Sequence, residues 1–341
     1  MTPTWPRVTL AFLSWNRLHY LRATLESARA CIQYPNLEWI VSDNESDEPG
    51  LREYVDSCAW VQQRWSRRQT HADAMNELVS RCTGEYLLIW PEDVQFTVRG
   101  DWLADLVEIL DRHRWIGSVC LDYMRSATLQ GIFHPKAWAL RYRLMDELVR
   151  YRHRFRRSRL VTSSRGYAVR TFGWVKQGIC GSGIPSLTRT EVWRDLGPWR
   201  AANAGTRLID SSLGAEDDMV MRFYRSRRPL QGATPLVPVA ADIVTDPTGC
   251  KAKVRGRYRY GVYMPPPEGT FYYRIRKQSE LPVPRAGWPL SFREGVEPLG
   301  FRIPTDARGD RLKSSINLSV AYDLVERRPV PYPLVEDAKK P

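Results

Sequence analysis

Patterns typical of strands and helices alternate at short intervals from residue 8 to residue 123. Apolar, β-rich runs predict strands at 8–13, 37–43, 60–65, 85–90 and 116–123. Runs with helical spacing predict helices between them, at 18–31, 48–58, 71–82 and 101–113. Thr70 is the expected cap of the third helix. Because such alternation builds right-handed βαβ units, we expect an α/β fold with a mainly parallel sheet covered on both faces.

Composition limits the partners without choosing among them. The chain has 341 residues, 43% of them hydrophobic, which is enough for one large domain or one domain with an extension. Its formal net charge of +13 favours anionic partners such as nucleotides, phospholipid surfaces or nucleic acid. The six cysteines form no C-x-x-C pair, which argues against zinc ribbons and thioredoxin-like chemistry. We see neither a signal peptide nor a membrane span, so a cytoplasmic location is expected.

Polar side chains follow three of the predicted strands. Ser14-Trp15-Asn16 ends the first, Asp43 ends the second, and Glu92-Asp93 follows the fourth. In parallel sheets ligands bind at the carboxyl ends of the strands, although turn chemistry alone also favours such residues there. The chain lacks the glycine-rich loops that cradle phosphates. The acids would therefore hold Mg²⁺ or Mn²⁺, and the metal would hold a diphosphate.

Four segments together resemble the family 2 glycosyltransferases, which are nucleotide-sugar-dependent enzymes with the GT-A fold. The segments are "VTLAFLSWNRLHYLRATLES", "LEWIVSDNESDE", "HADAMNELVSRCTGEYLLIWPEDVQF" and "GAEDDMVMRF", and the resemblance covers residues 8–245. It implies a Rossmann-like nucleotide-binding half with a mainly parallel sheet. We expect a GT-A domain at 1–250, and a basic, Pro-rich C-terminal extension packed on it at 251–341.

The resemblance also implies residue roles in donor binding. The donor nucleotide would be bound by Leu13, Ser14, Trp15, Asn16, Asp43, Asp73, Asn76 and Glu92. Pro91-Glu92-Asp93 stands in the place of the family's D-x-D motif, with proline instead of the first Asp, so Asp93 would be the metal ligand for Mn²⁺ or Mg²⁺. Where many members carry a further His ligand, this chain offers only Asp242 and Asp246.

The segment Gly214-Ala215-Glu216-Asp217 resembles the family's E-D motif, whose Asp is the general base. A carboxylate can accept the proton of an acceptor hydroxyl as that oxygen attacks the anomeric carbon, which gives inversion in a single displacement. Asp218 follows at once, but neighbours on a helix point about 100° apart. Alternatively, the acids are only a favourable first helical turn. Donor sugar and acceptor would meet at Gly181, Ser182, Gly183 and Glu216.

Two segments, 141–170 and 251–277, interleave arginines with aromatic residues or His. This composition suits contact with phosphates and stacking on bases, or contact with anionic headgroups. A solvated face with arginine stems lying along the surface explains it equally.

The leading hypothesis is an inverting glycosyltransferase that builds a polysaccharide or another glycoconjugate. A UDP-sugar is the favoured donor, because Asp43 suits the imide of uracil, and a glycan or lipid-linked glycan is the acceptor. One alternative is a glycosyltransferase that modifies a hydroxylated base in DNA. Another is a degenerate transferase fold that only binds nucleic acid or a membrane. The first hypothesis places the protein in the cytoplasm, either free or peripheral at the inner face of a membrane.

Overall fold

The computed structural model describes the greater part of the N-terminal 242 residues. The described ranges are 5–15, 18–92, 94–96, 98–121, 159–171, 185–200, 230–235 and 239–242, with residues 215, 218, 219, 222, 223 and 226. Four short strands after residue 269 are described by their backbone.

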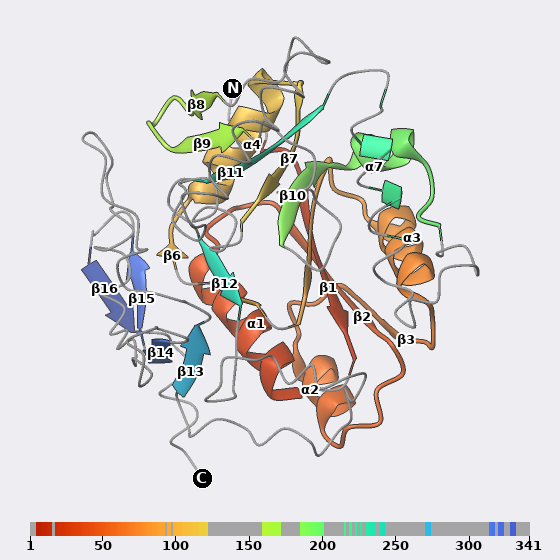
Figure 1. Ribbon diagram of the computed structural model, residues 1–341. Helices are drawn as coiled ribbons and strands as arrows, with labels where there is room; N and C mark the ends of the chain where they lie inside the picture. The colour runs from red at the N-terminus through yellow and green to blue at the C-terminus, as the bar shows by residue number, and fades with distance from the viewer. Residues whose placement is uncertain are drawn as a thin grey trace, which may run out of the picture.

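The first half of the chain is a series of βαβ units, as the sequence predicts. Its elements are β1 (Val8–Ser14), α1 (Leu18–Cys31), β2 (Leu37–Asp43), α2 (Leu51–Ser57), β3 (Gln63–Ser66), α3 (His71–Arg81) and β4 (Tyr86–Pro91). The four strands pair in parallel in the order β3-β2-β1-β4. Thr70 caps α3 by accepting a hydrogen bond from the backbone N–H of Asp73, as expected. The α/β class with a mainly parallel, Rossmann-like first half, expected for a GT-A fold, is confirmed (Figure 1).

The second half mixes strand directions. Its larger elements are α4 (Trp102–Arg112), β7 (Ile116–Cys120), β8 (Leu160–Thr162), β9 (Ala168–Thr171), β10 (Ser186–Arg189), α7 (Thr190–Leu196) and β11 (Gln231–Pro235). The full sheet of nine strands has the order β3-β2-β1-β4-β10-β7-β11-β9-β8. β10 lies antiparallel between β4 and β7, so the fifth predicted strand does not pair with the fourth. This insertion follows from long-range pairing, which local hydrophobic periodicity does not encode.

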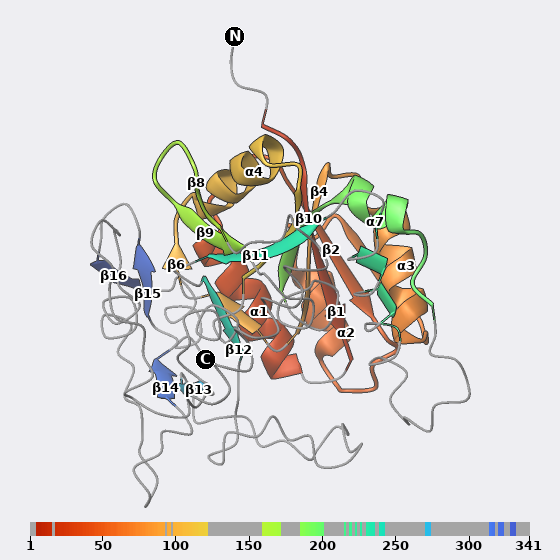
Figure 2. The ribbon, with the colours of Figure 1, turned by 45° about the horizontal axis from the view of Figure 1, so that its top comes forward.

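Helices cover both faces of the sheet (Figure 2). Side chains alternate along β1, where Leu10 and Phe12 point into one core cluster and Ala11 into the other. The first cluster contains the apolar faces of α1, α2 and α4, and the second contains those of α3 and α7. Burial on both faces explains why the strands are almost continuously apolar rather than alternating.

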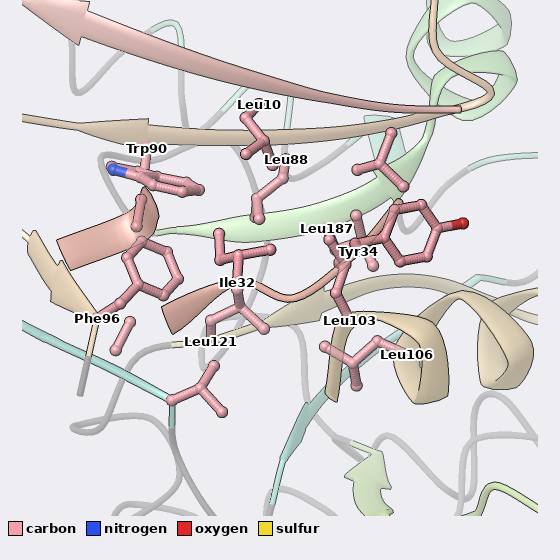
Figure 3. Close-up of a cluster of buried hydrophobic side chains, with 14 of the residues drawn as sticks. Leu10, Ile32, Tyr34, Leu88, Trp90, Phe96, Leu103, Leu106, Leu121 and Leu187 are labelled. Carbon is pink, nitrogen blue, oxygen red and sulfur yellow. The ribbon is translucent and has the colours of Figure 1, made fainter. Parts of the chain in front are cut away.

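Aromatic side chains pack in series beneath the end of β4. The ring of Trp90 lies 4.4 Å from the ring of Phe12 on one side and 4.4 Å from the ring of Phe96 on the other, between centroids. The Phe96 ring stacks in turn on Trp102, at 5.8 Å. Figure 3 shows Trp90 and Phe96 facing each other at one end of the buried cluster. The turn between β4 and β5 (Val94–Phe96) therefore has a packed aromatic side chain in the strand on each side of it, Trp90 before the turn and Phe96 after it.

Short strands close to this turn bring in distant parts of the chain. β12 (Ala240–Asp242) pairs antiparallel with β5, and Asp242 is opposite Val94. β15 (Val320–Asp323) pairs with β6 (Val98–Arg99) in parallel and with β16 (Arg328–Pro331) in antiparallel orientation. β13 (Thr270–Tyr273) pairs with β14 (Ser314–Asn317). The C-terminal region thus contributes one strand, β15, which lies beside β6. A domain boundary at residue 250 stays a prediction.

Candidate active site

The strand register brings the predicted polar residues to one edge of the sheet. Ser14 is paired with Asp43, and Asp43 with Ser66, across β1, β2 and β3. Leu13 is paired with Pro91 of β4, the residue before Glu92. The carboxyl ends of these four parallel strands therefore form a continuous edge, which is where ligands bind in sheets of this kind.

Asp43 is buried, and its carboxylate is held by two serines. Oδ2 accepts hydrogen bonds from the backbone N–H of Ser46 at 2.9 Å and from the hydroxyl of Ser66 at 2.7 Å. Oδ1 accepts one from the hydroxyl of Ser46. An ionised carboxylate has about four acceptor positions, and the bonds that it makes with the described residues occupy three of them and fix its orientation. Ser66 was not among the sequence candidates, although its place at the end of a predicted strand was a usable signal.

Ser14 is 3% exposed, and its Oγ has no hydrogen-bond partner within the described residues. A buried hydroxyl without a partner costs about 1–3 kcal/mol. Such a group at a strand end calls for an explanation, and a ligand polar atom is one. Of the neighbours predicted with it, Leu13 is partly buried against the second core cluster and Trp15 is partly exposed. Asn16 lies outside the described residues.

The loop after β2 is fixed by hydrogen bonds. Asn44 accepts a bond from the backbone N–H of Gln69 at 2.7 Å, and Glu48 accepts one from the N–H of Leu18, the first residue of α1, at 2.8 Å. Glu45 between them has a φ of 55°, in the left-handed region that side chains other than glycine seldom adopt. The surrounding bonds therefore hold this loop in a shape that the isolated segment would rarely adopt.

The acidic turn after β4 is tied to α1. Glu92 is buried at 4% exposure, and its backbone carbonyl accepts a hydrogen bond from the hydroxyl of Thr24. Ser27, one turn further along α1, accepts from the backbone N–H of Phe96 at 3.0 Å. Sequence reasoning missed both hydroxyl residues. Their signal was a Thr and a Ser three positions apart beside the apolar stripe of α1, where polar groups require partners.

The two candidates on α3 have defined intramolecular partners. Asp73 is exposed and accepts a hydrogen bond from the hydroxyl of Thr70 at 2.7 Å, which makes it part of the helix cap. Asn76 donates from Nδ2 to the carbonyl of Trp199 at 3.0 Å and accepts from the N–H of Trp199 at 2.7 Å. A nucleotide-binding role for either residue stays a prediction, and Asn76 has a clear structural task in addition.

Several candidates lie outside the described residues: Asp93, Gly181, Ser182, Gly183, Glu216 and Asp217. Asp218 is described, and it pairs with Arg222 one helical turn later, with 2.9 Å between the guanidinium and Oδ2. That guanidinium also donates to carbonyls at the end of α7. The Asp218 carboxylate is thus engaged in a structural cluster. A general-base role for Asp217 stays a prediction.

Arginine is used internally where the first basic segment is described. Arg165 pairs with Asp101, the N-cap residue of α4, and with Asp105 of α4, at 2.9 Å from Asp105. Arg159 lies over the ring of Trp115. Burial raises the pKa of Asp105 to about 6, although the hydroxyl of Ser163 donates to it. These contacts favour a structural use of Arg159 and Arg165 over free phosphate binding. Residues 141–158 and the second basic segment lie outside the described side chains.

No group of three or more His, Cys, Asp or Glu side chains within the described residues could hold a metal ion. None of the described helices is long and apolar enough to cross a membrane.

Comparison with known proteins identifies a resemblance over the first half. Residues 11–177 match the family model described as "Glycosyl transferase family 2". The chain resembles this family there, as the sequence motifs indicate, and the match supports a glycosyl-transfer function. The matched range includes Asp43, Glu92 and Asp93, and it ends before Gly181 and Asp217. No curated protein matches the chain.

Several solved structures show a distant likeness to this chain. One is a mannosyltransferase, PcManGT from Pyrobaculum calidifontis, in complex with GDP-Man and Mn²⁺, with 18% identity and a TM-score of 0.42 over 70% of this chain and 61% of that chain. Another is S. aureus TarS 1-349 in complex with UDP, with 13% identity and a TM-score of 0.38 over 67% and 60% of the two chains. GalNAc-T7 with UDP, GalNAc and Mn²⁺ has 12% identity and a TM-score of 0.42 over 68% and 44%. The chain therefore spans about three fifths or less of the length of these structures.

Proposed function

From the family 2 match over residues 11–177, we propose that this chain is an inverting glycosyltransferase that uses a nucleotide-diphosphate sugar. The observation that carries the proposal is the edge formed by Ser14, Asp43 and the acidic turn. A buried hydroxyl that has no partner among the described residues and a buried, oriented carboxylate lie at neighbouring strand ends there. Both groups can bind the polar edge of a ligand.

The nucleotide is proposed to lie along this edge with its base against Asp43. A carboxylate accepts a hydrogen bond from the imide N–H of uracil or thymine, so a UDP-sugar is the favoured donor. The two serines that hold the carboxylate keep it from rotating, which reduces the entropy lost when a ligand binds. Ser14, whose Oγ has no partner in the part of the chain that the structure describes, would add a second polar contact.

A divalent cation is proposed at the acidic turn, with Asp93 as ligand. The chemistry of the donor set fits Mn²⁺ or Mg²⁺, because both prefer carboxylate oxygens. The pairing of β12 with β5 brings the backbone of Asp242 opposite Val94, next to Asp93 in the chain, so Asp242 is the proposed further ligand. When bound, the cation supplies positive charge beside the leaving diphosphate.

The proposed chemistry is a single displacement with Asp217 as general base. The Asp217 carboxylate accepts the proton of the acceptor hydroxyl while the acceptor oxygen forms a bond to the anomeric carbon. The bond from that carbon to the phosphate oxygen breaks, and the nucleotide diphosphate leaves with the electron pair. Attack opposite the leaving group inverts the anomeric configuration. The acceptor is proposed to be a glycan or a lipid-linked glycan, and Gly181, Ser182, Gly183 and Glu216 are proposed to line the place where it meets the donor sugar.

A panel of UDP-, GDP- and TDP-sugars tests this proposal. Binding is measured by calorimetry, and nucleotide release is measured with and without Mn²⁺, using water or methyl glycosides as acceptors. We expect one nucleotide class to bind and to be turned over, with UDP-sugars favoured. Absence of binding by every member of the panel would reject the proposal.

A further inference from the structure

Arg222 connects the helical residues that follow the E-D motif with the end of α7. Its guanidinium donates to the Asp218 carboxylate at 2.9 Å. The same group donates to three consecutive carbonyls, those of Leu196 at 2.6 Å, Gly197 at 3.3 Å and Pro198 at 2.8 Å. One side chain thus binds a carboxylate and the carboxyl end of a helix, a position that favours a cation.

The carbonyls that Arg222 binds belong to a segment fixed to the sheet. Thr190, the first residue of α7, donates its N–H to the carbonyl of Glu85 at 2.9 Å and its hydroxyl to that of Gly84 at 2.7 Å. Arg194 donates to the carbonyl of Cys82 at 3.3 Å. α7 is therefore bound to the turn that connects α3 with β4. The carbonyls at its carboxyl end are thus held in place when Arg222 binds them.

The segment is also held from α3. The Asn76 amide makes its two hydrogen bonds with the backbone of Trp199 directly after the carbonyls that Arg222 binds. The Trp199 ring packs against Trp193, with 5.5 Å between centroids, and against His71, at 6.2 Å. Asn76 and Arg222 thus hold neighbouring parts of one short segment, residues 196–199. Through this segment, α3 is connected to the helical residues after the E-D motif.

Core packing fixes another face of the described residues in and after the motif. Ala215, Met219 and Phe223 recur at intervals of four residues and are fully buried. The Phe223 ring lies so close to Gly117 of β7 that a Cβ there would be 2.4 Å from Cζ. Apolar contacts on one side and the Arg222 bonds on another together restrict both rotation and sliding of this helical segment.

We propose that Arg222 is a positioning residue for the general base. It holds the backbone next to Asp217 in a fixed position relative to the sheet edge that carries Ser14 and Asp43. This inference rests on the proposed function. The Asp218 carboxylate is bound by Arg222, and the proposed base is the neighbouring Asp217. A displacement of about 1 Å in a catalytic group can lower turnover about 100-fold. Loss of the Arg222 bonds should therefore lower kcat more than it weakens donor binding.

The variants are Arg222→Met, which removes all four bonds, and Arg222→Lys, which keeps the charge beside Asp218 but cannot span three carbonyls. Arg52→Met is the matched control, because Arg52 forms an exposed pair with Asp56 one turn away on α2. Amide hydrogen exchange of peptides spanning 215–223 is measured in each protein. We expect exchange at least about tenfold faster there in Arg222→Met, with α3 and β1 unchanged and the control like the parent. Unchanged exchange at 215–223 would overturn the inference without affecting the proposed function.

Turnover separates positioning from a merely structural role. With the UDP-sugar that the panel selects, kcat should fall about 10- to 100-fold in Arg222→Met and less in Arg222→Lys, while the Kd for UDP with Mn²⁺ stays within about twofold. In an Asp217→Asn background, Arg222→Met should cause no further loss, because residues that act through one another are not additive. An equal loss in both backgrounds would contradict the inference, whereas an active Asp217→Asn enzyme would contradict the proposed base instead.

Discussion

The hydroxyl of Ser66 donates a hydrogen bond of 2.7 Å to the carboxylate of Asp43, joining the ends of β3 and β2. Together with the bonds from Ser46, it holds a buried carboxylate at the edge of the sheet. The orientation of the Asp43 carboxylate is thus set before any ligand binds. The strength of its proposed hydrogen bond to the base of the nucleotide should depend on that orientation.

Replacement of Asp43 by Ala should weaken UDP binding even without metal. The variant removes a hydrogen bond to a charged group, so we expect a loss of affinity of about 10- to 100-fold. Ser66→Ala should have a smaller effect, because the carboxylate remains but is less firmly held. Calorimetric titration with UDP in EDTA measures both, and Asp56→Ala, an exposed acid on α2, is the control. Equal affinity in parent and Asp43→Ala would reduce Asp43 to a turn residue.

Asp93→Ala should remove the part of nucleotide binding that depends on Mn²⁺ or Mg²⁺. The residue follows the end of an apolar strand, so the fold should persist. In the parent, adding Mn²⁺ should strengthen UDP binding, and in Asp93→Ala it should not, so that the variant behaves like the parent in EDTA. The same gain from Mn²⁺ in both proteins would rule out Asp93 as the ligand.

The fold was predictable where local pattern decides it. α1 and β2 begin and end where hydrophobic periodicity places them, and Thr70 caps α3. β10 was not predictable in its antiparallel place between β4 and β7, because register and strand order depend on contacts between residues far apart in the chain.

The candidate site was predictable only in part, for the same reason. The edge formed by Ser14 and Asp43 follows from parallel strands. The bonds of Thr24 to the Glu92 carbonyl and of Asn76 to Trp199 arise from tertiary packing. The sequence of a helix can indicate that such a polar residue needs a partner, but it cannot say which residue that partner is.

Glu38 should make stability depend on pH. Burial would raise the pKa of this carboxyl, but hydrogen bonds from Thr9, Thr83 and Gln63 outweigh it and lower the pKa below its ordinary value of 4.5. A lowered pKa in the folded state contributes stability above pH 4.5, and that stability is lost as the pH falls further. Glu38→Gln should therefore be less stable at pH 7, by about 1–3 kcal/mol, and the difference should shrink on acidification. Urea unfolding at several pH values measures it, and a difference independent of pH would contradict this assignment.

The most direct test of the account is the turnover of Asp217→Asn beside that of Asp218→Asn. Asparagine keeps the size and shape of the side chain but cannot accept the acceptor proton. With the selected UDP-sugar and a methyl glycoside as acceptor, kcat of Asp217→Asn should fall about 10²- to 10⁴-fold, with donor affinity nearly unchanged. Asp218→Asn should lose much less, because asparagine can still accept from Arg222, which also keeps its bonds to the three carbonyls at the end of α7. Glu216→Gln should be intermediate. Full activity in Asp217→Asn together with loss in Asp218→Asn, or full activity in both, would contradict the account.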